Sequence, residues 1–326
     1  MNVLVAGGAG FIGSHLCKRL LDEKHTVYCV DTLITGAESN IKPLESNPNF
    51  KFIKHDVTLP IDTEKYHINK LDAIFHLASP ASPNHHSPLS YHALPMETMM
   101  VNTVGTHELL KLAEAHNTKF LFASTSETYG DPLEHPQREE YRGNVSSTGP
   151  RSVYDEAKRF GETLTAYYER SKNLDTRIIR IFNTYGPNMQ EADKRMIVNF
   201  INQALEDKPI TIFGNGKQTR SLCYIDDTVE GIMRLMFYPN TKGEIVNIGS
   251  SEEHTVHEYA ELIKKLTNSS SEVIFSEDLP KDDPLQRRAD TTKAKKLLNW
   301  ETKVSLEDGL KKIIDYFKQE QSQKQA

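Results

Sequence analysis

The sequence predicts a doubly wound α/β fold, in which helices cover both faces of a parallel β-sheet. Through the first half of the chain, short and almost continuously apolar runs alternate with helical patterns, as expected for strands that are buried on both sides. A glycine-rich turn joins the first apolar run to the first helical pattern. The length of 326 residues corresponds to about two domains, which leaves room for a second lobe.

Six apolar runs form the expected strands, and helical patterns separate them. The strands are predicted at 2–6, 26–31, 51–57, 72–78, 119–124 and 177–182, and the helices at 14–24, 103–116 and 154–172. After about Gly186 the pattern loosens, and short strands at 210–213 and 244–248 mix with short helices and turns. We therefore expect a first domain at 1–185, a smaller α+β lobe at 186–318 with some segments returning to the first domain, and a frayed polar tail at 319–326.

Composition excludes several classes of protein. Lys and Arg number 39 against 45 Asp and Glu, and the net charge of −6 argues against nucleic-acid binding. No apolar run approaches the ~18 residues of a membrane helix, and the start of the chain has no secretory leader pattern. Three cysteines are too few for a disulfide framework and lack metal-site spacing. We expect a soluble, cytoplasmic protein.

Histidines are the only residues that suggest a metal. His85, His86 and His92 lie close together in the sequence. No Asp, Glu or Cys set with matching spacing accompanies them, so no metal site is expected.

The glycine-rich turn predicts a dinucleotide site. Gly7, Gly10 and Gly13 follow the first strand and open the first helix, with Phe11 and Ile12 between them. Glycines at this spacing allow a tight turn, close approach of a pyrophosphate and packing of helix on strand, while the helix N-terminus attracts the phosphates. Together with the strand–turn–helix context, the motif predicts a Rossmann domain.

Polar and apolar residues at the ends of the next strands extend this site. Asp31 ends the second strand, where a carboxylate binds a ribose 2′-hydroxyl and repels a 2′-phosphate, so NAD is favoured over NADP. The alternative is that Asp31 only caps a turn. Asp56 and Val57 are expected near the adenine. The remaining expected cofactor contacts are Leu77 and Ala78.

Three further residues form a candidate reaction centre. Tyr154 and Lys158 are four residues apart, so they share one face of a helix. A tyrosine needs its pKa lowered by ~3 units to act as a base at neutral pH, and Lys158 together with an oxidised nicotinamide has the right charge to do so. Thr125 follows the fifth strand, at the sheet edge where doubly wound folds bind ligands. The alternative for the pair alone is a solvated helix face.

Taken together, these motifs resemble the extended short-chain dehydrogenase/reductases that modify nucleotide sugars. More specific strings resemble the UDP-glucuronate decarboxylase (UDP-xylose synthase) family, and the resemblance covers nearly the whole chain. The strings are HLASPASP at 76–83, STSETYGDP at 124–132, GPRS at 149–152, RIFNTYGP at 180–187, QTRS at 218–221 and LEDGL at 306–310.

The resemblance implies decarboxylation of a UDP-linked uronic acid through a transient 4-keto sugar, with tightly bound NAD. Tyr154 would be the base and Thr125 would stabilise the 4-oxygen. Glu127 would orient the sugar ring. Ser126 stands where related 4,6-dehydratases have an aspartate, so the general acid of dehydration is missing and a substrate carboxylate is favoured.

The resemblance also implies substrate contacts and an assembly. The expected substrate-binding residues are Ser79, Ser126, Asn183, Arg195, Arg220 and Arg287. Asn102 precedes a predicted helix and is either its cap or an active-site residue. The helices at 103–116 and 154–172 are expected to pair in a homodimer.

Some positions depart from the family pattern, so the identity of the sugar in the substrate is not determined. They are 141–143, 146–149, Val153, 287–290 and a longer segment at 84–96. A UDP-N-acetylglucosaminuronate decarboxylase and a UDP-sugar 4-epimerase therefore stay as alternatives. The alternative outside enzymes is an NAD-sensing scaffold on the same fold.

Overall fold

A seven-stranded parallel sheet forms the centre of the protein in a computed structural model that describes residues 1–279 and 283–325. The strand order is β11-β6-β5-β4-β1-β2-β3. The strands are β1 (Asn2–Ala6), β2 (Thr26–Asp31), β3 (Phe50–Lys54), β4 (Ala73–His76), β5 (Lys119–Thr125), β6 (Thr176–Ile181) and β11 (Ile245–Ile248). The predicted doubly wound fold is confirmed.

Helices cover both faces of this sheet because alternate strand residues point to opposite sides. In β1, Val3 and Val5 belong to one hydrophobic core, whereas Leu4 and Ala6 belong to the other. The first core contains residues of α1 (Phe11–Asp22) and α7 (Ile225–Phe237), and the second contains residues of α4 (Thr106–His116) and α5 (Ser152–Lys172). All neighbouring strands of the sheet pair in parallel, so their carboxyl ends lie at one edge of the sheet.

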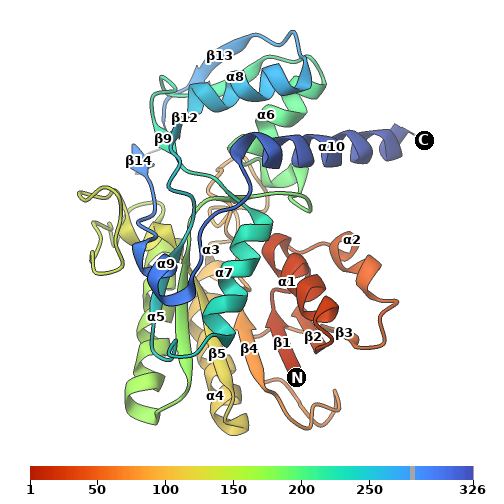
Figure 1. Cartoon of the computed structure of the whole chain (residues 1–326), viewed down its shortest axis with the longest axis vertical. Coiled ribbons are helices and arrows are strands. Elements are labelled where there is room, and N and C mark those ends of the chain that lie inside the picture. The colour runs from red at the N-terminus through yellow and green to blue at the C-terminus, as the bar shows by residue number, and fades with distance from the viewer. Residues whose placement is uncertain (280–282, 326) are drawn as a thin grey trace.

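A second lobe lies beyond that edge (Figure 1). It packs α6 (Met196–Leu205), α8 (Val256–Thr267) and α10 (Leu306–Gln325) with a parallel pair formed by β8 (Ile210–Phe213) and β13 (Val273–Glu277). A small sheet beside it has the order β12-β9-β14, from β12 (His254–Thr255), β9 (Thr219–Arg220) and β14 (Gln286–Arg287). This arrangement leaves a cleft between the sheet edge and the lobe.

Short elements complete the connections between these parts. They are α2 (Glu38–Ile41), η1 (Lys42–Leu44), α3 (Pro95–Met100), η2 (Val101–Gly105), η3 (Ser126–Tyr129), β7 (Thr184–Tyr185), η4 (Glu191–Asp193), β10 (Cys223–Tyr224) and α9 (Thr292–Leu298). None of the described helices has the length and apolar character needed to cross a bilayer.

The structure differs from the sequence-based expectations at several elements. The strand expected at 244–248 in the smaller lobe is instead β11, which pairs with β6 at the edge of the main sheet. The third strand ends at Lys54, so Asp56 and Val57 lie in the turn after it. Asn102 is no helix cap, because it lies inside the π-helical turn η2 and donates hydrogen bonds to Ser79 Oγ and Thr98 O.

The expected frayed tail is also wrong. Helix α10 continues to Gln325, and Ala326 lies outside the described residues. The segment after Leu310 has no glycine or proline and is rich in Gln and Lys, which are good helix formers. The polarity of residues 319–325 is therefore that of a solvent-exposed helix and does not by itself indicate a frayed tail.

Candidate active site

Three adjoining cavities follow the carboxyl edge of the sheet. The glycine-side cavity contains Asp31, Asp56, Val57 and Ala78. The central cavity contains Phe11, Ile12, Gly13, Thr125, Ser126, Tyr154 and Lys158. The arginine-side cavity contains Arg220 and Arg287. The first two share Gly7, Gly10, Leu77 and Ser79, and the last two share Glu127, Asn183 and Arg195. The structure thus brings every predicted cofactor, catalytic and substrate residue into one cleft.

The glycine turn fits a bound pyrophosphate. Gly7 has φ +81°, and a Cβ there would lie 2.6 Å from the backbone nitrogen of Ala78, so only glycine is accommodated. A Cβ at Gly10 would meet only the carbonyl oxygen of Gly7 within 4 Å, because this residue faces the cavity. The backbone of the turn is therefore open to a ligand at the start of α1.

Asp31 has the free acceptor capacity that a ribose requires. Its carboxylate accepts hydrogen bonds from Ala9 N at 3.0 Å and Leu33 N at 2.8 Å. A carboxylate has about four acceptor positions, so capacity remains for ribose hydroxyls. Burial raises the pKa of Asp31 above its ordinary value, although these backbone hydrogen bonds oppose the shift.

Tyr154 and Lys158 both lie buried on the α5 face that borders the central cavity. Burial raises the pKa of Tyr154, Glu127 raises it further, and a hydrogen bond with Thr125 opposes the rise. Lys158 Nζ donates to Ala123 O at 2.7 Å, and burial lowers the pKa of this lysine to about 7. Without the cofactor, burial therefore outweighs any lowering of the tyrosine pKa by Lys158, and the expectation that Lys158 and an oxidised nicotinamide lower it together stays a prediction. For Tyr154 to act as a base near neutral pH, a further positive charge beside its phenol must lower its pKa.

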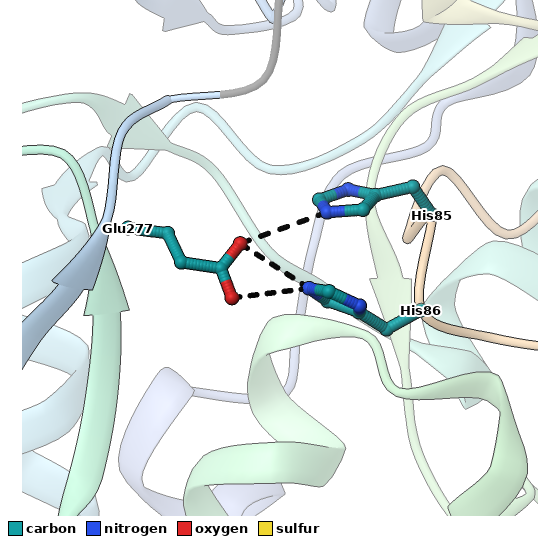
Figure 2. A group of neighbouring side chains, drawn as sticks. All are labelled: His85, His86 and Glu277. Atoms are coloured by element: carbon teal, nitrogen blue, oxygen red, sulfur yellow. Dashed lines mark hydrogen bonds and ion pairs between the residues drawn. The ribbon is translucent and has the colours of Figure 1, made fainter.

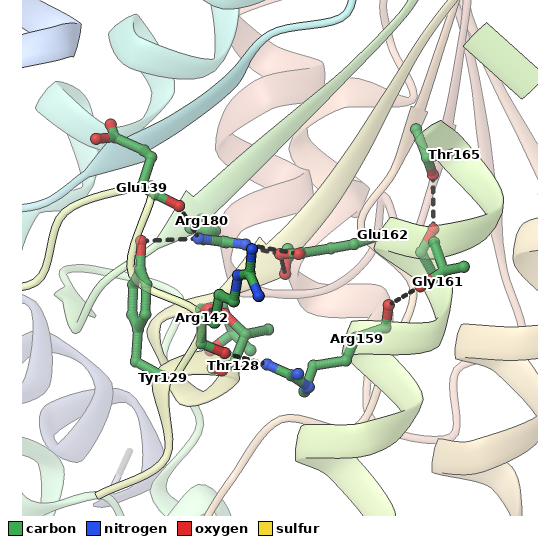
Figure 3. Close-up of polar contacts among 12 residues, drawn as sticks. Thr128, Tyr129, Glu139, Arg142, Arg159, Gly161, Glu162, Thr165 and Arg180 are labelled. Atoms are coloured by element: carbon green, nitrogen blue, oxygen red, sulfur yellow. Dashed lines mark hydrogen bonds and ion pairs between the residues drawn. The ribbon is translucent and has the colours of Figure 1, made fainter. Parts of the chain in front are cut away.

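A polar network holds α5 against the strands that carry the site (Figure 3). Arg180 of β6 forms two hydrogen bonds of 2.8 Å with Glu162 of α5, and Ser124 Oγ donates to the same carboxylate at 2.6 Å. Arg159 donates to the carbonyl oxygens of Thr128 and Arg142. These contacts join α5 to β5, β6 and the turn after β5. They therefore fix the position of Tyr154 and Lys158 relative to Thr125.

Glu127 lies between two buried arginines. Arg151, at the start of α5, donates to its Oε2 at 2.5 Å, and Arg287 of β14 lies 3.4 Å from its Oε1. Burial would raise the pKa of Glu127, but the two guanidinium groups outweigh it and lower this pKa to about 2. Glu127 is therefore ionised at neutral pH and is an acceptor rather than a general acid.

The neighbouring carboxyl group behaves in the opposite way. Burial and the negative charge of Glu127 raise the pKa of Asp155 to about 8, despite the opposing charge of Arg151. Direct interaction of the two carboxyl groups adds to both shifts, since it lowers the pKa of Glu127 and raises that of Asp155. At neutral pH the pair thus holds one proton, on Asp155.

The proton on Asp155 is expected to make the stability depend on pH. Unfolded aspartate ionises near pH ~4, whereas folded Asp155 keeps its proton to about pH 8, so the free energy of unfolding falls as the pH rises through this window. Asp155→Asn cannot ionise. We expect its stability relative to wild type to increase between about pH 5 and pH 8, by at least about 1 kcal/mol in urea unfolding. Parallel pH–stability curves for the two proteins would contradict the assignment.

Tyr91 stacks on Tyr154. The two rings lie 4.9 Å apart with an angle of 8°, and Tyr91 is fully buried. Its hydroxyl donates to Glu127 Oε2 at 3.3 Å, and the Arg151 guanidinium lies 5.9 Å from its ring. Tyr91 therefore fixes both the phenol and the carboxylate.

Two substitutions separate these contacts. Tyr91→Phe keeps the stacking and removes one hydrogen bond, so we expect a loss of about 1 kcal/mol in unfolding free energy and a small fall in turnover. Tyr91→Ala leaves a cavity against Tyr154, for which we expect a loss of about 3 to 5 kcal/mol. Equal effects of the two substitutions on urea unfolding and turnover would show that the ring itself contributes nothing.

The arginine-side cavity is locally positive although the chain is acidic. Its lining includes the cations Arg151, Lys194, Arg195, Arg220 and Arg287 and the carboxylates Glu127 and Asp283. Asp283 bridges Arg151 at 3.1 Å and Arg220 at 2.8 Å. The buried Nε of Arg287 has no hydrogen-bond partner among the described residues. Unused donors and excess positive charge fit an anionic ligand.

Four members of this site were not predicted from the sequence: Tyr91, Arg151, Asp155 and Asp283. Arg151 and Asp155 flank the start of the Tyr154 helix, so their position was a usable signal. Tyr91 falls in the segment at 84–96, whose extra length gave no indication of a role. Asp283 meets Arg151 across 132 residues, which local patterns do not reveal.

Fold and site together define a dinucleotide-dependent enzyme with an anionic substrate. The model of the NAD dependent epimerase/dehydratase family matches residues 3–249, and the chain belongs to this family.

Within the family, the curated relatives of this chain include UDP-glucuronic acid decarboxylases. UDP-glucuronic acid decarboxylase 2 of Arabidopsis thaliana is 47% identical over 98% of this chain and 68% of the relative. UDP-glucuronic acid decarboxylase 1 of Xenopus tropicalis is 44% identical over 98% and 72%. Among solved structures, UDP-glucuronic acid 4-epimerase of Bacillus cereus, in complex with UDP-glucuronic acid and NAD, matches with a TM-score of 0.85 and 33% identity over 98% of this chain and 99% of that chain.

Proposed function

We propose that this protein removes carbon dioxide from UDP-glucuronate, with NAD as a cofactor that is regenerated in each cycle. One observation carries the proposal. An ionised Glu127, held between Arg151 and Arg287, lies in the same cleft as Tyr154, Thr125 and the glycine turn. This arrangement gives a uronate carboxylate cationic partners and leaves no protonated acid in the position that dehydration requires.

The cofactor is NAD, in agreement with the family description and with the NAD-bound relatives. The open glycine turn would hold its pyrophosphate and Asp31 its ribose, with Asp56 and Val57 near the adenine. When bound here, NAD supplies a reversible hydride acceptor for carbon 4 of the sugar and a positive charge beside Tyr154.

Tyr154 moves the first proton. Its Oη takes the proton of the sugar 4-hydroxyl, and Thr125 holds the phenolate by a hydrogen bond. The 4-ketone that forms is β to the carboxylate. The carbon–carbon bond to the carboxylate can then break, and its electron pair moves to the 4-oxygen as an enolate. Thr125 and the protonated Tyr154 donate hydrogen bonds to that oxygen.

The carboxyl cluster completes the cycle. Carbon 5 of the enolate must gain one proton after carbon dioxide leaves, and Asp155 beside Glu127 holds a proton at neutral pH that it could supply. Asp155 would then regain a proton from solvent before the next cycle, since each decarboxylation consumes one proton. Tyr154 returns its proton to the 4-oxygen when the ketone is reduced, so the products are a UDP-pentose and carbon dioxide. Arg220 and the unpartnered Nε of Arg287 would hold the anionic parts of the substrate.

The experiment compares UDP-glucuronate with UDP-N-acetylglucosaminuronate, following carbon dioxide and product mass. We expect UDP-glucuronate to lose ~44 Da, the mass of one carbon dioxide, by cleavage of the 4-keto sugar. If only UDP-N-acetylglucosaminuronate were decarboxylated, that sugar nucleotide would be the substrate and the proposed reaction steps would stay the same. A product of unchanged mass and inverted carbon 4 would identify an epimerase, and NAD binding without any turnover would identify a sensor.

We also propose a homodimer and a cytoplasmic location. Phe160 and Tyr167 on the outer side of α5 are 49% and 47% exposed, and Met100 beside it is 41% exposed, which supports pairing through α4 and α5. All three cysteines are free and buried, as in proteins of a reducing compartment. Sedimentation of the protein and of Phe160→Asp tests the dimer: wild type should sediment as two chains and the variant as one.

A further inference from the structure

Two histidines and a glutamate converge at the rim of the arginine-side cavity (Figure 2). His85 and His86 lie on the loop after β4, and Glu277 is the last residue of β13 in the second lobe. Each offers one ligand atom, and these atoms lie within 4.8 Å of one another. We propose that this His85–His86–Glu277 cluster binds a divalent transition-metal ion of the zinc class.

The distances suit a tetrahedral ion. Glu277 Oε2 lies 3.6 Å from His85 Nε2 and 3.2 Å from His86 Nε2. Two ligands that each lie 2.0–2.1 Å from a tetrahedral zinc are about 3.3 Å apart. One carboxylate oxygen therefore already stands at the required separation from both imidazole nitrogens. Rotation of the exposed side chains brings the two imidazoles together.

The chemistry of the ligands selects the metal. Two imidazoles and one carboxylate form the His₂Glu set of open zinc sites, which leave a position for water. Magnesium and calcium prefer oxygen ligands and are disfavoured here. Among residues 1–279 and 283–323, the Glu277 carboxylate pairs with no lysine or arginine, and its ion-pair partners are the two histidines of the cluster. Its charge therefore faces the proposed site.

Backbone contacts fix both sides of the cluster before any ion binds. On the loop, Ser82 Oγ and Ser87 Oγ donate to the carbonyl oxygens of Asp193 and Ala192 at 2.8 and 2.6 Å, and Asn84 Oδ1 accepts from His86 N at 2.9 Å. On the strand, the carbonyl oxygen of Glu277 accepts from Gly214 N at 2.7 Å. Such preorganisation lowers the entropic cost of binding an ion.

The location suggests what the ion does. His85 also lines the arginine-side cavity, together with Phe213 of β8. An ion shared by His85, His86 and Glu277 would join the loop of the first domain to β13 of the second lobe at the mouth of this cavity. The ion would hold the rim in place. Tyr154 lines the central cavity and not this one, so the expected role of the ion is structural.

Titration of untagged, chelator-stripped protein with zinc chloride tests the proposal. We expect one zinc ion per chain at micromolar or lower concentration, with an increase in Tm and much weaker binding of magnesium and calcium. His85→Asn, His86→Asn and Glu277→Gln should each raise the zinc dissociation constant at least about tenfold, because even partners of ligands contribute that much. The side chains are 41–48% exposed, so these variants should fold.

The control is His257→Gln, which removes an exposed histidine of α8 outside the cluster and should bind zinc like wild type. Two results would overturn the proposal. One is the absence of zinc binding at micromolar concentration. The other is equal zinc affinity of wild type and Glu277→Gln, which would show that the three side chains form only a hydrogen-bonded contact or that zinc binds elsewhere.

Discussion

Tyr154→Phe is expected to lose release of carbon dioxide by about a thousandfold or more, because the general base that takes the 4-hydroxyl proton is removed. The ring stays, and so does its stacking against Tyr91, so the fold is expected to be intact. NAD should still co-purify with the variant, since the glycine turn and Asp31 are untouched. Turnover assays and the NAD released on denaturation measure the two effects.

The two readouts separate the proposed chemistry from a binding role. If the Tyr154→Phe variant released carbon dioxide at the wild-type rate, Tyr154 would not be the group that takes the 4-hydroxyl proton. Loss of NAD together with loss of turnover would show that the phenol holds the cofactor. Thr125→Val is a useful companion, because it removes the hydrogen bond to Tyr154 and should lower turnover less than Tyr154→Phe does.

Arg151→Met is expected to lower the free energy of unfolding by about 3 kcal/mol and turnover by about a hundredfold. Removal of one partner from a buried ion pair leaves the other charge without compensation. Among the described residues, the only ion pair left to Glu127 would be the longer one with Arg287, and the only one left to Asp283 would be that with Arg220. Urea unfolding and carbon dioxide release measure the two losses.

A matched control uses an arginine on the surface. Arg138 is 62% exposed and pairs with Glu134, so Arg138→Met should change stability by less than about 0.5 kcal/mol. Arg151→Lys should recover part of the stability but less of the turnover, because an ammonium lacks the planar fork that meets both Glu127 and Asp283. If Arg151→Met behaved like the surface variant, the Glu127 cluster would have no role in folding or catalysis.

The first domain could be predicted almost completely from local patterns. β1 and β2 have the predicted bounds, and the glycine turn between β1 and α1 lies where the motif required. Burial on both faces makes parallel strands continuously apolar, and a tight turn admits only glycine. The strand at 245–248 is one of the segments that return to the first domain, and its pattern predicted a strand but not which strand it pairs with.

Charge states at the site could not be predicted in the same way. The Tyr154–Lys158 spacing correctly placed both residues on one buried face, yet burial raises the tyrosine pKa and lowers the lysine pKa to about 7. Both shifts depend on how much solvent the whole fold removes from these groups. Sequence spacing carries no information about that burial.

The sequence by itself therefore determined the cofactor half of the protein, since each βα unit brings its ligand-binding residues together within a few positions of one another. The tertiary structure decided the substrate half. Glu127 meets Arg151 and Arg287 across 24 and 160 residues, and His86 meets Glu277 across 191. The physical reason is that the contacts of Arg287 and Glu277 form only when the second lobe packs over the carboxyl edge of the sheet, whereas the contact of Arg151 forms when the start of α5 meets the turn after β5 within the first domain.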